Sequence, residues 1–214
     1  MVSKEMGKWP PGRASIPQEM SEALKRERCA AAICELAHEV GAARLTVSLV
    51  TSRSGISRST FYALFAGFDA ATDHALNLSR GKLIEPIEDA VRTVAPWEEQ
   101  VRSLLGALTG AALADPFAAE LCLVHGPALL EMPTGPYDRD VVQAVAGGIK
   151  ETAPASDGSP PLLAELCAYG AVSMVSQCLV DSRLDDLADL HNPVAEMIIR
   201  LYEEGVASSR QGCS

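Results

Sequence analysis

Apolar and polar residues begin to follow a helical period after residue 20. From Cys29 to Val40 the apolar side chains recur at i, i+3, i+4, i+7, i+8 and i+11, which is one face of an amphipathic helix, and Gly41 follows as its expected stop. Residues 1–20 contain three prolines and little periodicity. We therefore expect a flexible N-terminal arm over 1–20, followed by a first helix that starts near residue 21.

Two short helices joined by a tight turn are predicted next. Thr46 is a typical N-cap residue for the first helix, and Ser57 for the second. Between them, Gly55 can adopt the positive φ that a tight helix–helix turn requires. Two helices of about two turns each, joined in this way, match a helix-turn-helix. The apolar positions of the second helix lie at i, i+3 and i+4, namely Phe61, Leu64 and Phe65.

The rest of the chain also has the pattern of helices, without strand-like alternation or repeats. Pro86 is expected to kink or break a long helix over 68–94, while Asn192 and Pro193 are expected to cap and open the last helix. An all-α fold follows, with an N-terminal three-helix bundle over 21–67 and a larger helical domain over 68–214. Its further helices are expected over 96–114, 115–126, 135–153, 162–181 and 192–205, with a loop at 154–161.

Charge is distributed unevenly along the chain. The protein carries a formal net charge of −10, yet residues 1–65 hold nine basic and six acidic residues, while residues 66–214 hold nine basic and 22 acidic ones. A mildly basic head on an acidic body confines any contact with nucleic acid to the head. The acidic body is explained by a solvated surface that repels DNA, although it also favours cationic ligands.

Several classes of protein are disfavoured. Six cysteines without a Cys-x-x-Cys pair predict buried free thiols rather than disulfides or a metal site. The sequence lacks a phosphate loop, paired metal ligands and a nucleophile elbow, so we expect no enzyme, no catalytic residues and no cofactor. No apolar run reaches the roughly 18 residues of a membrane span, and no signal peptide is apparent, which predicts a cytoplasmic protein.

The stretch LTVSLVTSRSGISRSTFYALF, residues 45–65, resembles the DNA-binding region of the TetR family of bacterial transcriptional regulators. Thr46 matches the threonine that opens the second helix of the family. Residues 54–57 (SGIS) stand for its Ala-Gly-Val-Ser, and residues 61–65 (FYALF) stand for its aliphatic-Tyr-x-x-Phe ending. The motif match covers roughly residues 24–70, and the rest of the chain agrees with the family in helix count and length.

The resemblance implies a protein that binds a palindromic DNA operator as a homodimer and is released by a small-molecule ligand, most often as a repressor. The chain departs from the family at four positions, one of which is Leu64, where a histidine or an aromatic residue often precedes the closing Phe. Alanine is usual in place of Thr51 and Ser54, and a lysine that often touches phosphate is usual in place of Phe68.

The second helix of the motif is expected to lie in the major groove. With its apolar set facing inward, Arg58 and Ser59 face outward, and the guanidinium fork of Arg58 fits the O6/N7 pair of guanine. The resemblance assigns a phosphate contact to Tyr62, and Thr46 can bind phosphate at a helix N-terminus. Capping alone also explains Thr46 and Ser57, and Tyr62 can be a packing residue. The candidate DNA-binding residues are Thr46, Ser57, Arg58, Ser59, Thr60 and Tyr62.

The helical body is expected to supply a dimer surface and a ligand pocket. The interface candidates are apolar stripes on the last two helices, although these can also cover the core of their own subunit: Val172, Val175, Leu179, Ile198, Leu201 and Tyr202. The pocket candidates are equally compatible with an ordinary core: Trp97, Phe117, Cys122, His125, Met132, Tyr137, Tyr169, Met174 and Gln177.

Two functional hypotheses from different classes remain. The first is the ligand-responsive regulator that the resemblance implies, with double-stranded DNA, an effector and a second copy of the chain as partners and no membrane. The second is a regulator-like helical scaffold whose DNA binding has weakened and which acts through protein partners. Phe68 in place of the usual lysine keeps the second hypothesis open.

Overall fold

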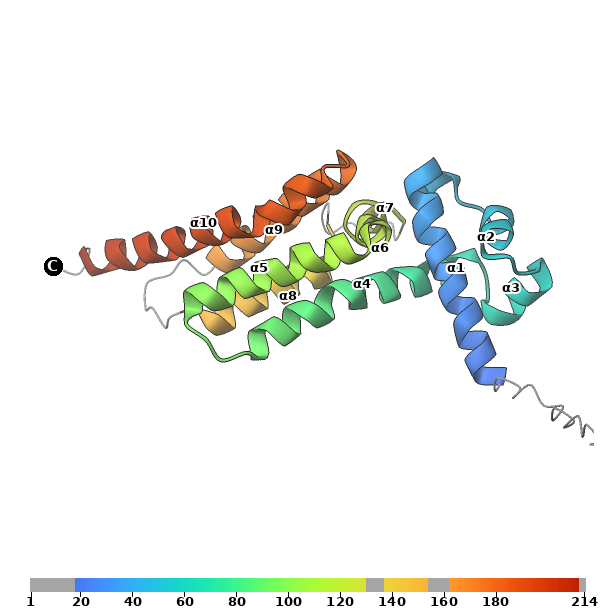
Figure 1. The fold of residues 1–214 in the computed structure, drawn as a ribbon, viewed down its shortest axis with the longest axis horizontal. Helices are drawn as coiled ribbons and strands as arrows, with labels where there is room; N and C mark the ends of the chain where they lie inside the picture. The colour runs from blue at the N-terminus through green and yellow to red at the C-terminus, as the bar shows by residue number, and fades with distance from the viewer. Residues whose placement is uncertain (1–17, 130–136, 154–161, 212–214) are drawn as a thin grey trace, which may run out of the picture.

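The chain folds into helices throughout the residues that its computed structural model describes, which are 18–129, 137–153 and 162–211 (Figure 1). The predicted all-α class is confirmed. In chain order the helical elements are α1 (Gln18–Val40), η1 (Ala42–Arg44), α2 (Val47–Ser54), α3 (Arg58–Leu64), α4 (Phe68–Arg92), α5 (Trp97–Ala114), α6 (Pro116–Glu120), the π-helical turn η2 (Leu121–His125), α7 (Gly126–Leu129), α8 (Arg139–Thr152), α9 (Leu163–Val180) and α10 (Leu184–Gln211).

Local capping explains where α2 and α3 begin. The Thr46 hydroxyl accepts the backbone N–H of Leu49 at 3.3 Å, and the Ser57 hydroxyl accepts the backbone N–H of Thr60 at 3.0 Å. Gly55 ends α2 in the left-handed conformation, with φ 65°, which glycine adopts without the steric cost of a side chain. Both predicted caps and the predicted turn are confirmed.

Two hydrophobic clusters divide the described residues into a head and a body. The head cluster joins α1, α2, α3 and the first turns of α4, and both Ile33 and Phe61 are fully buried in it. The body cluster joins the second half of α4 to α5, α8, α9 and α10. Leu76 belongs to the head cluster and Leu83 to the body cluster. The two hydrophobic clusters therefore meet within α4.

Helix α4 connects the head with the body. It leaves the head and runs into the body beside α5 and α8, so the head occupies one end of an elongated molecule and the C-terminal end of α10 the other (Figure 1). Near the junction, α1 packs against α4, and α6 packs against both helices. Pro86 does not break α4, which continues to Arg92. The buried Leu83 and Ile87 on either side of it keep the helix packed on the body.

The last helix begins earlier than the sequence suggested. We expected Asn192 to cap it and Pro193 to lie in its first turn, but α10 already begins at Leu184 and Pro193 lies inside it. The reason is packing, because buried apolar residues precede and follow the proline on one helix face. Leu187, Val194 and Ile198 are all buried in the body core, and this burial offsets the helix hydrogen bond that Pro193 cannot donate.

Helix α9 is a core helix despite its composition. It is long and apolar enough to cross a membrane by these two criteria alone, yet half of its 18 residues are buried inside the fold. It packs between α8 and α10, and its buried face includes Val172 and Val175. Packing within the body therefore accounts for one side of this helix.

Candidate nucleic-acid interface

Helix α3 has one buried face and one exposed face. Phe61, Leu64 and Phe65 are buried in the head cluster, as their spacing predicts. Arg58, Ser59 and Tyr62 are exposed. The predicted orientation of the helix relative to the head is confirmed. Helix α3 therefore presents an arginine, a hydroxyl and a phenol to solvent at the end of the molecule opposite to the C-terminal end of α10 (Figure 1).

The N-terminus of α3 carries a small network of hydroxyl groups. Ser57 Oγ lies 2.8 Å from both Ser59 Oγ and Thr60 Oγ1, in addition to accepting the Thr60 backbone N–H. This network fixes the side chain of Ser57 as the cap. A hydroxyl group has one proton and two lone pairs, so the network still leaves hydrogen-bonding capacity at the exposed Ser59.

Tyr62 and Thr46 differ in how firmly they are held. The ring of Tyr62 packs edge-on against Phe61, with 5.5 Å between ring centroids, while more than half of the residue is exposed. Its ring thus has a packing role and its surface remains accessible. Thr46 is exposed at the start of α2 and its hydroxyl caps that helix. A cap hydroxyl beside free helix N–H groups is a geometry that binds phosphate.

Three of the six lysine and arginine side chains of the described head have partners within the protein. Arg53 donates to Glu35 at 2.9 Å and to Glu39 at 2.8 Å. Arg28 donates to the backbone carbonyl of Ser54 at the end of α2. Arg26 lies over the ring of Phe65, 5.1 Å from its centroid. Much of the positive charge of the head is therefore used to hold α1 against the helix-turn-helix.

The exceptions within the described head are Lys25, which is half-buried, and the two arginines Arg44 and Arg58. Both arginines are exposed, and neither forms an ion pair with another described residue. Arg44 lies in η1 before α2, and Arg58 lies in the first turn of α3. These two guanidinium groups are available to bind a polyanion without breaking an internal contact.

Three residues at which the sequence departs from the family form hydrogen bonds or apolar contacts inside the head. The Thr51 hydroxyl donates to the carbonyl of Val47 at 2.8 Å, and the Ser54 hydroxyl donates to the carbonyl of Val50 at 2.6 Å. Both buried hydroxyls are thus satisfied by their own helix, as buried polar groups require. Phe68 packs against the head cluster. It adds apolar contact where a lysine would offer charge.

The structure does not bring the predicted ligand-pocket residues together. Cys122 is fully buried in the body core, where burial raises the pKa of its thiol. Trp97 packs on Tyr202, whereas Phe117 lies beside His38 at the junction with the head. His125 faces Glu120, with Nε2 3.2 Å from Oε1. These side chains face different parts of the body and do not line one pocket.

The remaining pocket candidates are at the surface or outside the described residues. The hydroxyl of Tyr137 donates to Ser173 at 2.8 Å, which ties the start of α8 to α9. Tyr169, Met174 and Gln177 are exposed on α9. Met132 lies outside the described residues. Helical spacing alone does not show which face of a helix lines a pocket and which faces solvent. The residues predicted for one pocket are therefore found in different parts of the body.

The predicted dimer interface is corrected, because most of its residues are buried inside a single protomer. Within one protomer, five of the six residues are buried in the core of the body, namely Val172, Val175, Leu179, Ile198 and Tyr202. A second chain cannot reach them unless the body opens. Leu201, the sixth residue, is exposed. The stripes therefore mark the inner faces of α9 and α10, which is the alternative that the sequence left open.

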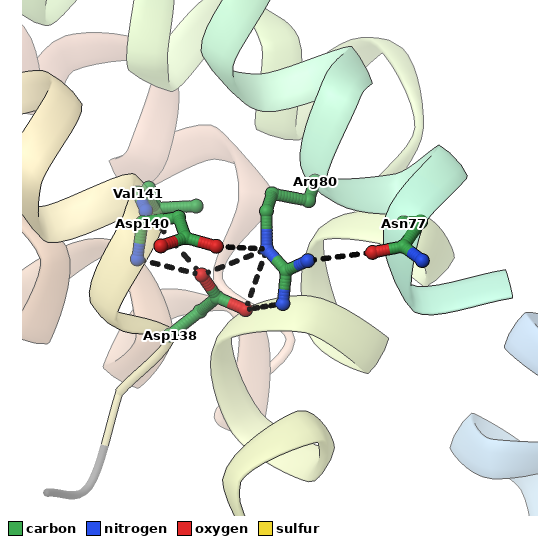
Figure 2. Close-up of polar contacts among 5 residues, drawn as sticks. All are labelled: Asn77, Arg80, Asp138, Asp140 and Val141. Atoms are coloured by element: carbon green, nitrogen blue, oxygen red, sulfur yellow. Dashed lines mark hydrogen bonds and ion pairs between the residues drawn. The ribbon is translucent and has the colours of Figure 1, made fainter. Parts of the chain in front are cut away.

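One buried polar site gave no signal in the sequence. Arg80 on α4 and Asp138 before α8 are far apart in the chain, but the guanidinium donates through Nη2 to the Asp138 carboxylate at 2.7 Å (Figure 2). Asp138 also caps α8, and Asn77 accepts from Arg80 Nη1 at 2.7 Å. The pair fastens the start of α8 to the helix that leaves the head.

No family model matches the chain, and no curated protein is significantly similar to it in sequence. Solved structures do match. The fatty acid degradation regulator FadR from Bacillus halodurans superposes with a TM-score of 0.67 at 16% identity, covering 81% of this chain and 94% of that one. FadR from Bacillus subtilis, in complex with stearoyl-CoA, gives 0.61 at 17% identity, with 80% and 96% covered.

A TetR-like transcriptional regulator from Rhodococcus sp. RHA1 gives a TM-score of 0.59 at 14% identity, covering 86% of this chain and 97% of that one. The agreement therefore spans both the head and the body rather than the helix-turn-helix alone. At these identities it concerns the fold. The chain has the fold of the TetR-family regulators, as the motif over residues 45–65 predicts.

Proposed function

We propose that the protein is a transcriptional regulator that binds a two-fold operator as a homodimer and is released from it by a small-molecule ligand. The observation that carries the proposal is the geometry of α3. Its apolar residues are buried in the head, while Arg58, Ser59 and Tyr62 are exposed on the opposite face. An exposed helix with this composition, presented at the end of an elongated fold, suits insertion into a major groove.

The proposed roles follow from side-chain chemistry. Arg58 reads a guanine through its forked donors. Ser59 and Thr60 contact base edges or phosphate, and Tyr62 donates its phenol to a phosphate. Thr46 and Ser57 keep their cap positions and present the amide groups of their helices to the backbone of the DNA. Arg44 adds neutralising charge at the edge of the motif.

The proposed dimer uses the outer faces of α9 and α10 rather than the inner stripes. Leu162, the N-cap residue of α9, and Leu166 and Tyr169 on that helix are exposed at i, i+4 and i+7. On α10, Met197 and Leu201 are exposed one turn apart. Exposed apolar stripes on two neighbouring helices are typical of a surface that binds another protein. A second copy of the chain, packing the same helices against them, places two heads on one operator.

Ligand control is supported by the structural neighbours. FadR from Bacillus subtilis is described in complex with stearoyl-CoA, so a fold of this type accommodates an effector. In the proposed mechanism a ligand binds better to a conformation whose heads do not fit two successive major grooves. The shift in DNA affinity equals the difference between its affinities for the two conformations.

The scaffold hypothesis keeps one supporting observation. Arg26, Arg28 and Arg53 are engaged within the head, and Phe68 is packed against the head cluster. Few described cations remain for phosphate, and a weak dependence of any DNA binding on salt would follow. A scaffold would show no sequence preference at all, and this separates the two hypotheses.

The test is fluorescence anisotropy with the DNA upstream of the protein's own gene, in parallel with scrambled DNA of equal length. We expect Arg58→Ala to weaken operator binding by about 1–3 kcal/mol and to relax the preference at one base pair. The matched control is Arg92→Ala, which removes the same charge from an exposed ion pair near the end of α4, away from the head. Equal binding of operator and scrambled DNA by the parent protein contradicts the proposal.

Tyr62→Phe completes this experiment. The variant keeps the ring that packs on Phe61 and loses only the hydroxyl. Since a phosphate contact carries no sequence information, binding to operator and scrambled DNA should weaken to the same extent. A loss confined to the operator would assign Tyr62 to a base instead.

A further inference from the structure

A cleft lies where the head meets the body. Its volume is about 410 Å³, and its walls come from α1, from the middle of α4 and from α6, where the two hydrophobic clusters meet. This volume lies within the range of small-molecule sites in proteins, which runs from about 300 to 1,000 Å³. The cleft is separate from the positions at which the sequence placed a ligand pocket, with Phe117 as the one residue in common.

Small side chains make room for the cleft. Ala30 and Ala31 on α1 face Ala75 on α4 across it. Side chains of ordinary length at these positions would close the gap between the two helices. Ala30 and Ala75 are buried and Ala31 is exposed, so the cleft has a packed floor and an open mouth. Cys34 and Ser79 complete the floor, with Sγ and Oγ 3.6 Å apart.

The rim of the cleft is acidic. Glu27 and Glu35 on α1 and Asp115 at the start of α6 line it, against one cation, Lys82. Lys82 Nζ pairs with Asp115 at 2.6 Å, and Glu35 accepts from Arg53 at 2.9 Å. Glu27 forms no ion pair within the described part of the chain. The field at the mouth therefore favours a cation and repels an anion.

Two large apolar side chains at the mouth are covered only in part by the residues that the structure describes. Leu78 on α4 is 37% exposed and Phe117 on α6 is 41% exposed. Phe117 packs on one side against His38, 4.9 Å away between ring centroids. The exposed part of the Phe117 ring offers apolar contact to a molecule in the cleft. Leu78 offers apolar surface for the hydrocarbon part of the same molecule.

We propose that this junction cleft binds a small organic cation that carries an apolar body. Its ammonium group lies at the acidic rim near Glu27, while its apolar part covers the alanine floor, Leu78 and the ring of Phe117. An anion meets the acidic rim, and a neutral molecule gains only the apolar contact. The cleft is therefore selective for charge as well as for size.

Occupation of the cleft has a consequence that rests on the proposed function. The ligand touches α1, which belongs to the head, and α4 and α6, which carry the head on the body. It therefore binds with different affinity to states that differ in the angle between α1 and α4. A ligand of this kind shifts the head orientation and with it the affinity for an operator.

The binding test uses phenethylammonium and two molecules of the same shape, neutral 2-phenylethanol and anionic 3-phenylpropionate. Backbone amide NMR spectra of the full chain are recorded during each titration. We expect phenethylammonium to shift the resonances of residues 27–35, 75–82 and 115–117. Because of the acidic rim, it should bind about tenfold more tightly than 2-phenylethanol. The anion should leave these resonances unchanged. Absence of shifts in these segments, or equal affinity of the alcohol, overturns the proposal.

Variants locate the site. Glu27→Gln should lower the affinity for phenethylammonium several-fold, and Ala31→Leu should abolish binding by filling the cleft from an exposed helix position that accepts leucine. Glu19→Gln, an exposed carboxylate on the same helix outside the cleft, is the matched control and should bind as the parent does. Undiminished binding by Ala31→Leu places the probe elsewhere and overturns the assignment. Because these titrations contain no DNA, their outcome is independent of the anisotropy experiment on the operator.

Discussion

Arg80 and Asp138 form an ion pair that links the helix leaving the head to the beginning of α8. Asp138 is only 3% exposed, and its carboxylate accepts from Arg80 Nε at 3.1 Å and from Nη2 at 2.7 Å (Figure 2). The same carboxylate accepts the backbone N–H of Asp140 at 3.0 Å as the cap of α8. The hydrogen bonds from Arg80 to Asp138 raise the pKa of the guanidinium.

Asp138→Ala should destabilise the fold by up to about 3–5 kcal/mol, because it leaves a largely buried guanidinium with only the exposed Asp140 and Asn77 as partners and uncaps α8. The measurement is urea unfolding followed by circular dichroism. Asp89→Ala is the matched control, since Asp89 pairs with Arg92 at an exposed site on α4, where an ion pair contributes about 0–1 kcal/mol. Similar losses in the two variants would mean that the Arg80–Asp138 pair adds nothing beyond a surface ion pair.

The turn between α2 and α3 depends on glycine for two reasons. Gly55 has φ 65°, and a Cβ atom at this position would lie 2.9 Å from Arg28 Nη2. Gly55→Ala should therefore cost about 1–2 kcal/mol in backbone strain and displace the guanidinium that caps α2. Gly67→Ala is the control, because its backbone is extended and a Cβ there meets nothing within 4 Å. Thermal unfolding of both variants checks this, and equal melting temperatures would contradict it.

The helix-turn-helix could be predicted almost residue by residue from the sequence. Its information is local, since a cap residue, a glycine at the turn and an apolar triplet act within one or two helical turns. Thr46, Gly55 and Ser57 fulfil the expected roles for this reason. The same local rules misplaced the start of α10, because Asn192 and Pro193 have the chemistry of a helix start while tertiary packing carries the helix through them.

The body could be predicted as helices but not as a site. Apolar spacing shows that a helix has a buried face, yet it does not show whether a neighbour in the same chain or a second chain covers it. For this reason the sequence suggests a dimer interface at Val172 and Ile198, whereas both residues are buried in the core of their own subunit. The Arg80–Asp138 pair and the junction cleft depend on contacts between distant segments, for which the sequence holds no local signal.

If the dimer forms through the exposed faces of α9 and α10, a substitution on these faces should weaken it. Leu166 is 67% exposed on α9, and burial of a leucine in an interface stabilises it by roughly 2 kcal/mol. Leu166→Glu should shift the dimer–monomer equilibrium at least about tenfold towards monomer, as measured by sedimentation velocity. The control is Val94→Glu, at a residue 99% exposed between α4 and α5. An unchanged dimer in Leu166→Glu would place the interface on another face.

The phenol of Tyr202 should make the body sensitive to alkaline pH. Tyr202 is buried against Trp97, with 5.1 Å between ring centroids, and burial raises its pKa to about 12. In the unfolded chain a tyrosine ionises near pH 10. The unfolded state therefore loses its proton first, so stability is fully present below about pH 10 and falls as the pH rises towards about 12.

Urea unfolding of the parent and of Tyr202→Phe across this range isolates the contribution of the phenol. Phenylalanine keeps the contact with Trp97 and cannot ionise, so its stability curve should fall less steeply above pH 10, with a difference of at most roughly 2–3 kcal/mol. Below pH 9 the difference between the two proteins should stay constant, which serves as the internal control. Parallel curves up to pH 12 would show that Tyr202 ionises in the folded body as easily as in the unfolded chain.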